Sequence, residues 1–114
     1  MPSDLEKAAD WLMHVQEFAS AKAAHVEHLS EEHQVFEAKL HAQNVECAQL
    51  CLEDFVNGAA DDDPRFERVV ELRAKLRQAR DALRRFEFAD GSRMAGEVAG
   101  QINSLLRESG NLPQ

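Results

Sequence analysis

The chain has 114 residues, a formal net charge of −8, and only 5 glycines and 3 prolines. This length allows one small domain with a single core. The composition is 44% hydrophobic and 30% charged with few turn-forming residues, which excludes collagen-like chains, low-complexity chains and folds built from many short strands. We therefore expect one soluble all-α domain over residues 1–114.

Neither a membrane span nor a secretion signal is recognisable. No apolar run approaches the ~20 residues that a membrane-spanning helix needs, and the opening residues Met-Pro-Ser-Asp-Leu-Glu lack the basic-then-apolar order of a signal peptide. Two cysteines, Cys47 and Cys51, are too few for the disulfide framework of a small secreted domain. We expect a cytoplasmic protein with reduced thiols that does not bind membranes.

The charge is divided unevenly along the chain. Residues 1–63 contain 3 basic and 14 acidic side chains, residues 64–89 contain 8 and 4, and residues 90–114 contain 2 and 3. The three segments therefore carry −11, +4 and −1. Opposite charges favour pairing between the first two segments, and the acidic total argues against tight binding to nucleic acid.

The first predicted helix spans residues 3–57, which contain neither glycine nor proline. Ser3 and Glu6 have the spacing of a capping box at its start, and Asn57-Gly58 can end it. Most residues at heptad core positions are apolar, with Trp11 and Phe18 beside them. These positions are Leu5, Ala8, Leu12, Val15, Ala19, Lys22, Val26, Leu29, His33, Phe36, Leu40, Gln43, Cys47 and Leu50.

Two shorter helices are predicted after the first. The second spans residues 64–89, with Asp63 as its cap and Pro64 at its first position, up to an interruption at residues 89–92. The third spans residues 92–109, and residues 110–114 are expected to fray. Their apolar faces are Val69, Leu72, Leu76, Ala79, Leu83 and Phe86, then Met94, Val98, Ile102, Leu105 and Leu106.

Helix lengths make the architecture an open question. A helix over residues 3–57 would be ~80 Å long, against ~40 Å for residues 64–89. We favour a continuous first helix in an antiparallel hairpin plus the short third helix, completed as a coiled-coil-like bundle by dimerisation. The alternative is a compact monomeric four-helix bundle with a break near Ser30, where the following Glu31 and Glu32 resemble a helix start.

The hairpin also predicts specific ion pairs. Residues whose numbers sum to about 121–122 would face each other in a hairpin that turns near residue 61. The expected pairs are Glu53 with Arg68, Glu46 with Lys75, and Glu37 with Arg84. Because exposed pairs contribute only ~0.2–1 kcal/mol each, they would set the register more than the stability.

A histidine group could bind a metal ion. All five histidines precede residue 42, and His25, His28 and Glu32 share one helix face at spacings that could hold zinc or iron. Residues 64–114 contain no histidine, so a glutamate such as Glu71 or Glu87, or a second subunit, would have to complete the site. The alternative is that these histidines simply face water.

Three further features have structural as well as functional interpretations. Cys47 and Cys51 lie one helical turn apart and could bind a soft metal, or could be small buried residues. The stripe Arg73, Arg77, Arg80 and Arg84 could bind phosphate or an acidic partner, or could pair with acids of the same chain or a dimer. Gly96 and Gly100 form a small-residue face, against which Trp11 or Phe18 could pack, or they could mark a weakly formed helix.

No nucleophile–base–acid constellation, glycine-rich phosphate loop or nucleotide fingerprint is present, so we do not expect an enzyme or a cofactor. Our leading hypothesis is an adaptor, chaperone-like or scaffold protein, a homodimer that contacts partner proteins through a coiled-coil-type seam. The expected interaction residues are Leu5, Leu12, Val15, Trp11, Phe18, Val26, Leu29, Phe36 and the four stripe arginines. The alternatives are a metal-binding bundle and an acidic inhibitor that covers a basic surface.

Overall fold

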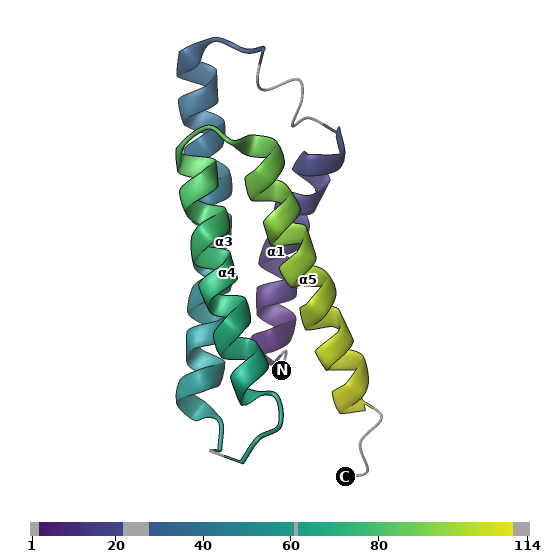
Figure 1. The fold of residues 1–114 in the computed structure, drawn as a ribbon. Coiled ribbons are helices and arrows are strands. Elements are labelled where there is room, and N and C mark those ends of the chain that lie inside the picture. Colours follow the sequence, from purple (N-terminus) through teal and green to yellow (C-terminus); the bar gives the residue numbers. More distant parts are fainter. Residues whose placement is uncertain (1–2, 22–27, 61, 111–114) are drawn as a thin grey trace.

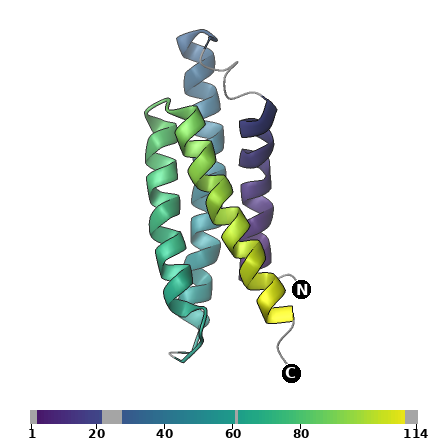
Figure 2. The same ribbon diagram turned by 45° about the vertical axis from the view of Figure 1, so that its right-hand side comes forward.

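A computed structural model of the chain describes residues 3–21, 28–60 and 62–110. These residues form four helices, α1 (Asp4–Ala21), α3 (Glu31–Gly58), α4 (Phe66–Arg84) and α5 (Phe88–Gly110), which confirms the all-α class. The helices run alternately up and down, and α5 lies oblique to α3 (Figures 1 and 2). Because α1 and α4 each pack against both α3 and α5, the fold is an antiparallel bundle measuring 52 × 22 × 22 Å.

The preferred continuous helix over residues 3–57 is wrong, and the alternative break near Ser30 is observed. α1 ends at Ala21, and α3 begins at Glu31. Ser30 has a non-helical ψ of 154°, and its hydroxyl accepts a hydrogen bond from the backbone N–H of His33. This cap and the acidic side chains of Glu31 and Glu32 stabilise a new helix N-terminus. Residues 22–27 lie outside the described chain.

The core lies along the bundle axis and receives apolar side chains from all four helices. On α1 the heptad positions Leu5, Ala8, Leu12 and Val15 are completely buried. The largest fully buried side chains are Phe88, Leu5, Leu12, Leu52, Leu76, Leu83, Ile102 and Leu105. Burying each such side chain stabilises the fold by roughly 1.5–3 kcal/mol. The four helices therefore form a buried core without a second subunit.

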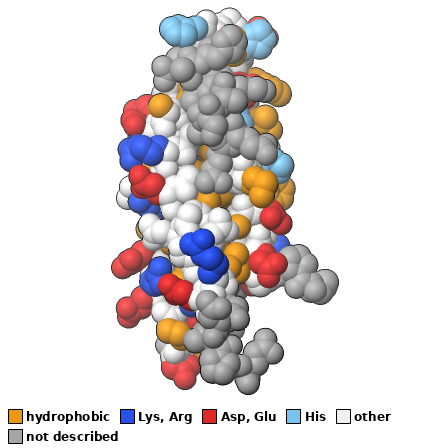
Figure 3. All heavy atoms as spheres, turned by 90° about the vertical axis from the view of Figure 1, so that its right-hand side faces the viewer, with side chains coloured by type: hydrophobic (Ala, Val, Ile, Leu, Met, Phe, Trp, Pro, Cys, Tyr) orange, Lys and Arg blue, Asp and Glu red, His pale blue; other side chains and the backbone are white. Residues whose placement is uncertain are grey.

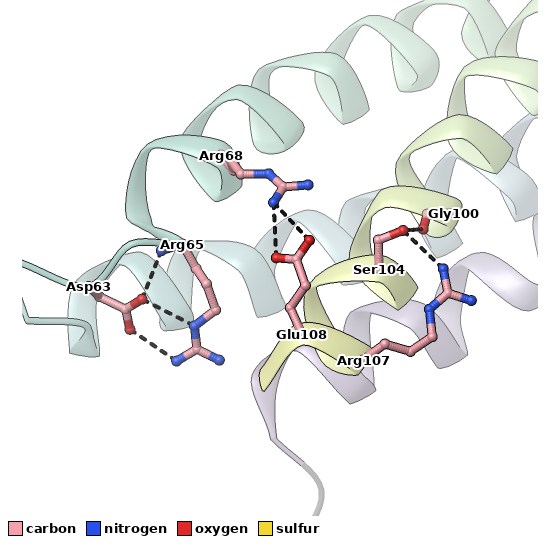
Figure 4. A network of polar contacts seen from close by, with 7 residues as sticks. All are labelled: Asp63, Arg65, Arg68, Gly100, Ser104, Arg107 and Glu108. Carbon is pink, nitrogen blue, oxygen red and sulfur yellow. Dashed lines mark hydrogen bonds and ion pairs between the residues drawn. The ribbon is translucent and has the colours of Figure 1, made fainter. Parts of the chain in front are cut away.

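α4 begins two residues later than predicted, at Phe66. Pro64 and Arg65 form a turn instead, closed by a 3.1 Å hydrogen bond from Phe66 N to Asp63 O. The predicted cap at Asp63 is also wrong, because the N-cap residue of α4 is Arg65 and no side chain caps it. Asp63 Oδ1 instead accepts from the backbone N–H of Arg65 at 2.9 Å, in the turn before the helix. The Arg65 guanidinium also donates to both carboxylate oxygens (Figure 4). These bonds lower the pKa of Asp63 below its usual value.

The predicted interruption at residues 89–92 is wrong, so the bounds of both C-terminal helices change. The turn falls at residues 85–87, where Phe86 has a positive φ of 65°. Glu87 N donates to Ala82 O at 2.9 Å and Phe86 N donates to Leu83 O at 3.1 Å, which is the hydrogen-bond pattern of a Schellman helix end. Phe86 occupies the left-handed position that glycine usually takes.

The predicted ion pairs are also wrong. Arg68 pairs with Glu108 of α5 at 3.2 Å (Figure 4), Lys75 pairs with Glu97 of α5, and only Arg84 reaches α3, at Glu46. Lys75 and Arg84 are nine residues apart, so at 100° per residue they lie on opposite sides of α4. One side of α4 therefore faces α5 and the other faces α3, which a two-helix hairpin does not anticipate.

Candidate interaction surface on α3

α3 carries apolar residues on two opposite faces. The face toward the core consists mostly of small or polar residues: Ala38, His41, Ala42, Val45, Ala48, Gln49 and Leu52. The opposite face, which we call the outer stripe, consists of Phe36, Leu40, Gln43, Cys47 and Leu50. Spacings of four, three, four and three residues keep the outer stripe within about 80° of the helix circumference.

The outer stripe exposes large apolar side chains. Phe36 is 62% exposed, Leu50 is 59% exposed and Leu40 is 41% exposed, whereas Cys47 is half-buried. Single exposed apolar residues are ordinary, but a row of them at helical spacing is the pattern of a binding face. On α3, therefore, large apolar side chains occur on both faces: Val45 and Leu52 are buried in the core, while Phe36, Leu40 and Leu50 are exposed on the opposite face.

Other exposed apolar side chains lie on α1 and in the α4–α5 turn. Trp11 is 39% exposed, Met13 is 51% exposed and Phe86 is 36% exposed. In Figure 3, hydrophobic and histidine side chains gather along the upper right-hand edge, while charged side chains dominate the left-hand edge. In this view the upper right-hand edge is thus more apolar than the left-hand edge.

An open groove of about 590 Å³ borders the outer stripe on its α4 side. Phe86 forms part of its wall and stacks on the buried ring of Phe88, with a centroid separation of 6.1 Å. Arg84 pairs with Glu46 within the same groove. Its lining residues are Val35, Ala38, Lys39, Ala42, Gln43, Glu46, Arg84 and Phe86.

The two edges of the outer stripe carry different groups. One edge carries four charged residues at intervals of seven: Glu32, Lys39, Glu46 and Glu53. Glu46 pairs with Arg84, while Lys39 forms no ion pair with the described residues. On the other edge, Glu37 Oε2 lies 3.0 Å from Nε2 of the buried His41. The stripe is therefore bordered mainly by acids, with one lysine among them.

The predicted apolar interaction residues lie in different environments. Leu5, Leu12 and Val15 are buried in the core, so in this fold they contact helices of their own chain. Leu29 packs partly buried against the core. Only Phe36 and Trp11 are exposed, while Val26 and the side chain of Phe18 lie outside the described part.

The sequence reasoning places Leu40 and Leu50 in the same heptad frame as Phe36, but does not include them among the interaction residues. The cap at Ser30 was the signal that could have found them, since a new helix start makes the earlier heptad frame unreliable. On α3 the core contacts fall instead at positions such as Val45 and Leu52.

The arginine stripe of α4 lies beside α3 and is only partly paired. Arg84 pairs with Glu46, and Arg80 pairs with its neighbour Asp81 at 3.2 Å. Arg73 is half-buried and Arg77 is exposed, and neither forms an ion pair with the described residues. In the arginine stripe, therefore, Arg80 and Arg84 form ion pairs within the chain, and Arg73 and Arg77 form none with the described residues.

The proposed metal ligands form no complete site among the described residues. His28 and Glu32 are exposed, and His25 lies outside the described residues. Among residues 3–21, 28–60 and 62–110, no group of three or more His, Cys, Asp or Glu side chains is arranged to hold a metal ion. The described side chains therefore supply no preformed metal centre.

The two cysteines are free and half-buried. Burial raises the pKa of the Cys51 thiol, and the nearby carboxylates of Asp4 and Asp54 raise it further. A thiol with a raised pKa forms less thiolate, the species that attacks electrophiles and binds metals. This environment favours the structural interpretation of Cys51.

The small-residue face of α5 differs from the prediction at Gly100. A Cβ atom at Gly100 would meet nothing within 4 Å, so neither Trp11 nor another described group packs closely there. Its carbonyl instead accepts from Ser104 Oγ at 3.2 Å, and Arg107 donates to the same hydroxyl (Figure 4). A close contact with a neighbouring helix is found at Gly91 of α5, beside Leu83.

Comparison with known proteins gives no family for this chain. No protein family, no curated protein and no solved structure matches it. No described helix is both long and apolar enough to cross a membrane. A functional proposal therefore depends on the chain's own surface.

Proposed function

We propose that the protein is a non-enzymatic helical assembly protein, an adaptor or scaffold whose outer stripe docks an amphipathic helix. The carrying observation is that Phe36, Leu40 and Leu50 are exposed along the face of α3 opposite its core face. Fully burying an exposed large apolar side chain contributes roughly 1.5–3 kcal/mol. Because these three are already partly covered, docking would gain a part of this for each of them.

The chemistry of the partner follows from the spacing of the stripe. Residues at alternating spacings of three and four form holes that accept the side chains of a helix with the same spacing. The partner is therefore a helix with apolar residues at heptad positions. The mixed edge, with Lys39 between Glu32 and Glu46, favours a partner that carries both charges.

Site-specific photo-crosslinking tests this proposal. A photoreactive phenylalanine analogue replaces Leu50 in one variant and Gln101, which is exposed on α5, in the matched control. Both variants are expressed in the cells that produce the protein and irradiated. We expect an adduct at position 50 and not at position 101, with the attached peptide carrying heptad-spaced apolar residues. Absence of an adduct at position 50, or equal labelling at both positions, contradicts the proposal.

The other two hypotheses, a metal-binding bundle and an acidic inhibitor, are not supported by contacts among the described residues. The metal-binding hypothesis depends on His25, which lies outside them. The acidic-inhibitor hypothesis depends on the charge of residues 1–63, but in the fold part of that charge is used within the chain, as in the pairs of Glu46 with Arg84 and Asp63 with Arg65.

A further inference from the structure

The charged edge of the outer stripe is complementary to itself in one orientation. Lys39 is the only basic side chain other than histidine between Glu31 and Gly58, which also contain six acidic side chains. Glu46 and Glu53 follow Lys39 at intervals of seven residues, so all three lie along the edge that faces α4. Glu32 precedes Lys39 on this edge, so the self-complementary part is the stretch from Lys39 to Glu53. Its cation lies at one end and its acids toward the other, so it can satisfy both by meeting a reversed copy of itself.

We propose that the helix docked on the outer stripe is α3 of a second copy of this chain, running antiparallel. This inference rests on the proposed function and names its partner. Around a two-fold axis near residue 45, Lys39 of each copy faces Glu53 of the other. Leu40 of each copy then packs against Leu50 of the other. The axis lies near the middle of Glu31–Gly58, so the two helices overlap along almost their whole length.

The axis also brings the two copies of Glu46 near each other. Each is already neutralised by Arg84 of its own chain, so their approach places two ion pairs side by side and not two bare carboxylates. The parallel alternative lacks this compensation. In register, it would place Lys39 opposite Asn44 and Glu32 opposite Glu37 of the second copy, which gives two symmetric like-charge contacts and no attraction.

Two chains that each carry a net charge of −8 repel each other, but salt weakens this repulsion between distant charges. At 0.15 M ionic strength the Debye length is ~8 Å, so charges remote from the interface contribute little. Contacts between Lys39 and Glu53 at the interface are closer than this and remain effective. The dimer is therefore expected under ordinary buffer conditions.

A disulfide experiment on the full chain reads out the orientation. Cys47 and Cys51 are first replaced by serine, and one preparation then carries Leu40→Cys while the other carries Leu50→Cys. After mixing and mild oxidation, we expect a disulfide between the two different chains and little cross-linking of Leu50→Cys with itself. Light scattering on the unmodified chain should give twice the 12.8 kDa mass of one copy.

The outcomes separate this inference from the proposed function. A dimer whose Leu50→Cys chains cross-link with each other would overturn the antiparallel orientation. A monomeric mass would overturn the second copy as partner. Either result leaves the proposed function to the photo-crosslinking experiment, where an adduct with a different protein would still support helix docking.

Charge reversal supplies an independent check. Lys39→Glu should raise the dissociation constant of the dimer about tenfold, because two symmetric attractions become repulsions. Adding Glu53→Lys to the same chain should restore it. Arg107→Glu, with the same change of charge on exposed α5, should leave it unchanged. Equal effects of Lys39→Glu and Arg107→Glu, or no rescue, would contradict the antiparallel pairing.

Discussion

Leu83 of α4 fills the space beside Gly91 of α5. A Cβ atom at Gly91 would lie 2.7 Å from Leu83 Cγ, 2.9 Å from Leu83 Cδ2 and 3.1 Å from the backbone oxygen of Ala79. Leu83 is fully buried, and close-packed interiors leave little room for such a side chain to shift. The close approach of the two helices near their connecting turn therefore depends on glycine at position 91.

Gly91→Ala is expected to lower the free energy of unfolding by about 1–2 kcal/mol. Overpacking costs ~1–3 kcal/mol, and the better helix propensity of alanine offsets up to ~1 kcal/mol of this. Gly100→Ala is the matched control, because its Cβ would meet nothing within 4 Å, and it should raise stability by about 1 kcal/mol. Urea denaturation measures both. Equal stabilities of the two variants would show that Leu83 yields without cost.

Phe86 provides a second comparison because its φ of 65° is unfavourable for any residue with a Cβ atom. Phe86→Gly and Phe86→Ala both remove the ring that stacks on Phe88, but only the glycine variant also removes the backbone strain. Glycine should therefore be more stable than alanine here by about 1 kcal/mol. Thermal unfolding of the two variants checks this. If alanine is as stable as glycine, position 86 does not hold a left-handed conformation.

The apolar faces of three helices could be predicted from sequence. On α1, Leu5 and Leu12 are buried, as their spacing predicts, and the same holds for Leu76 on α4 and Ile102 on α5. On these helices one face is clearly more apolar than the rest, so periodicity identifies the buried side. On α3 apolar residues occur on both faces, and periodicity alone selected the face that is exposed.

The turns show a different limit of sequence reasoning. The sequence around Gly91 predicts a helix break, because glycine commonly ends helices. Glycine also permits close helix packing, which is its role here, and Phe86 ends α4 although its residue type gives no such signal. The choice depends on which arrangement buries Phe88 and Leu83, a tertiary effect that local propensity does not contain.

Ser30→Ala tests the break between α1 and α3. Because the Ser30 hydroxyl accepts from the backbone N–H of His33, its loss should destabilise the protein by about 1 kcal/mol. Ser30→Asp keeps a cap acceptor and should remain close to the unmodified protein. A continuous helix predicts the opposite sign, since alanine has a higher helix propensity than serine. Chemical denaturation of the two variants therefore distinguishes the two architectures.

Asp63→Asn tests the contact between Asp63 and Arg65 in the turn before α4 through its pH dependence. The hydrogen bonds from Arg65 lower the pKa of Asp63 in the folded protein, so the folded state releases this proton more readily than the unfolded state. The carboxylate therefore stabilises the fold fully above the ordinary aspartate pKa of about 3.9, and this stabilisation is lost as the pH falls through the lowered folded pKa.

At pH 7, Asp63→Asn should reduce the free energy of unfolding by about 1 kcal/mol, the upper end for a largely surface ion pair. The difference from the unmodified protein should shrink as the pH falls below about 4, because the aspartic acid then also loses its charge. Asp62→Asn, at an exposed neighbouring position, is the control for the charge change alone. Denaturation curves at pH 7 and near pH 2.5 measure the effect. A difference that stays constant across this range would mean that the Asp63 carboxylate does not stabilise the turn before α4 through its charge.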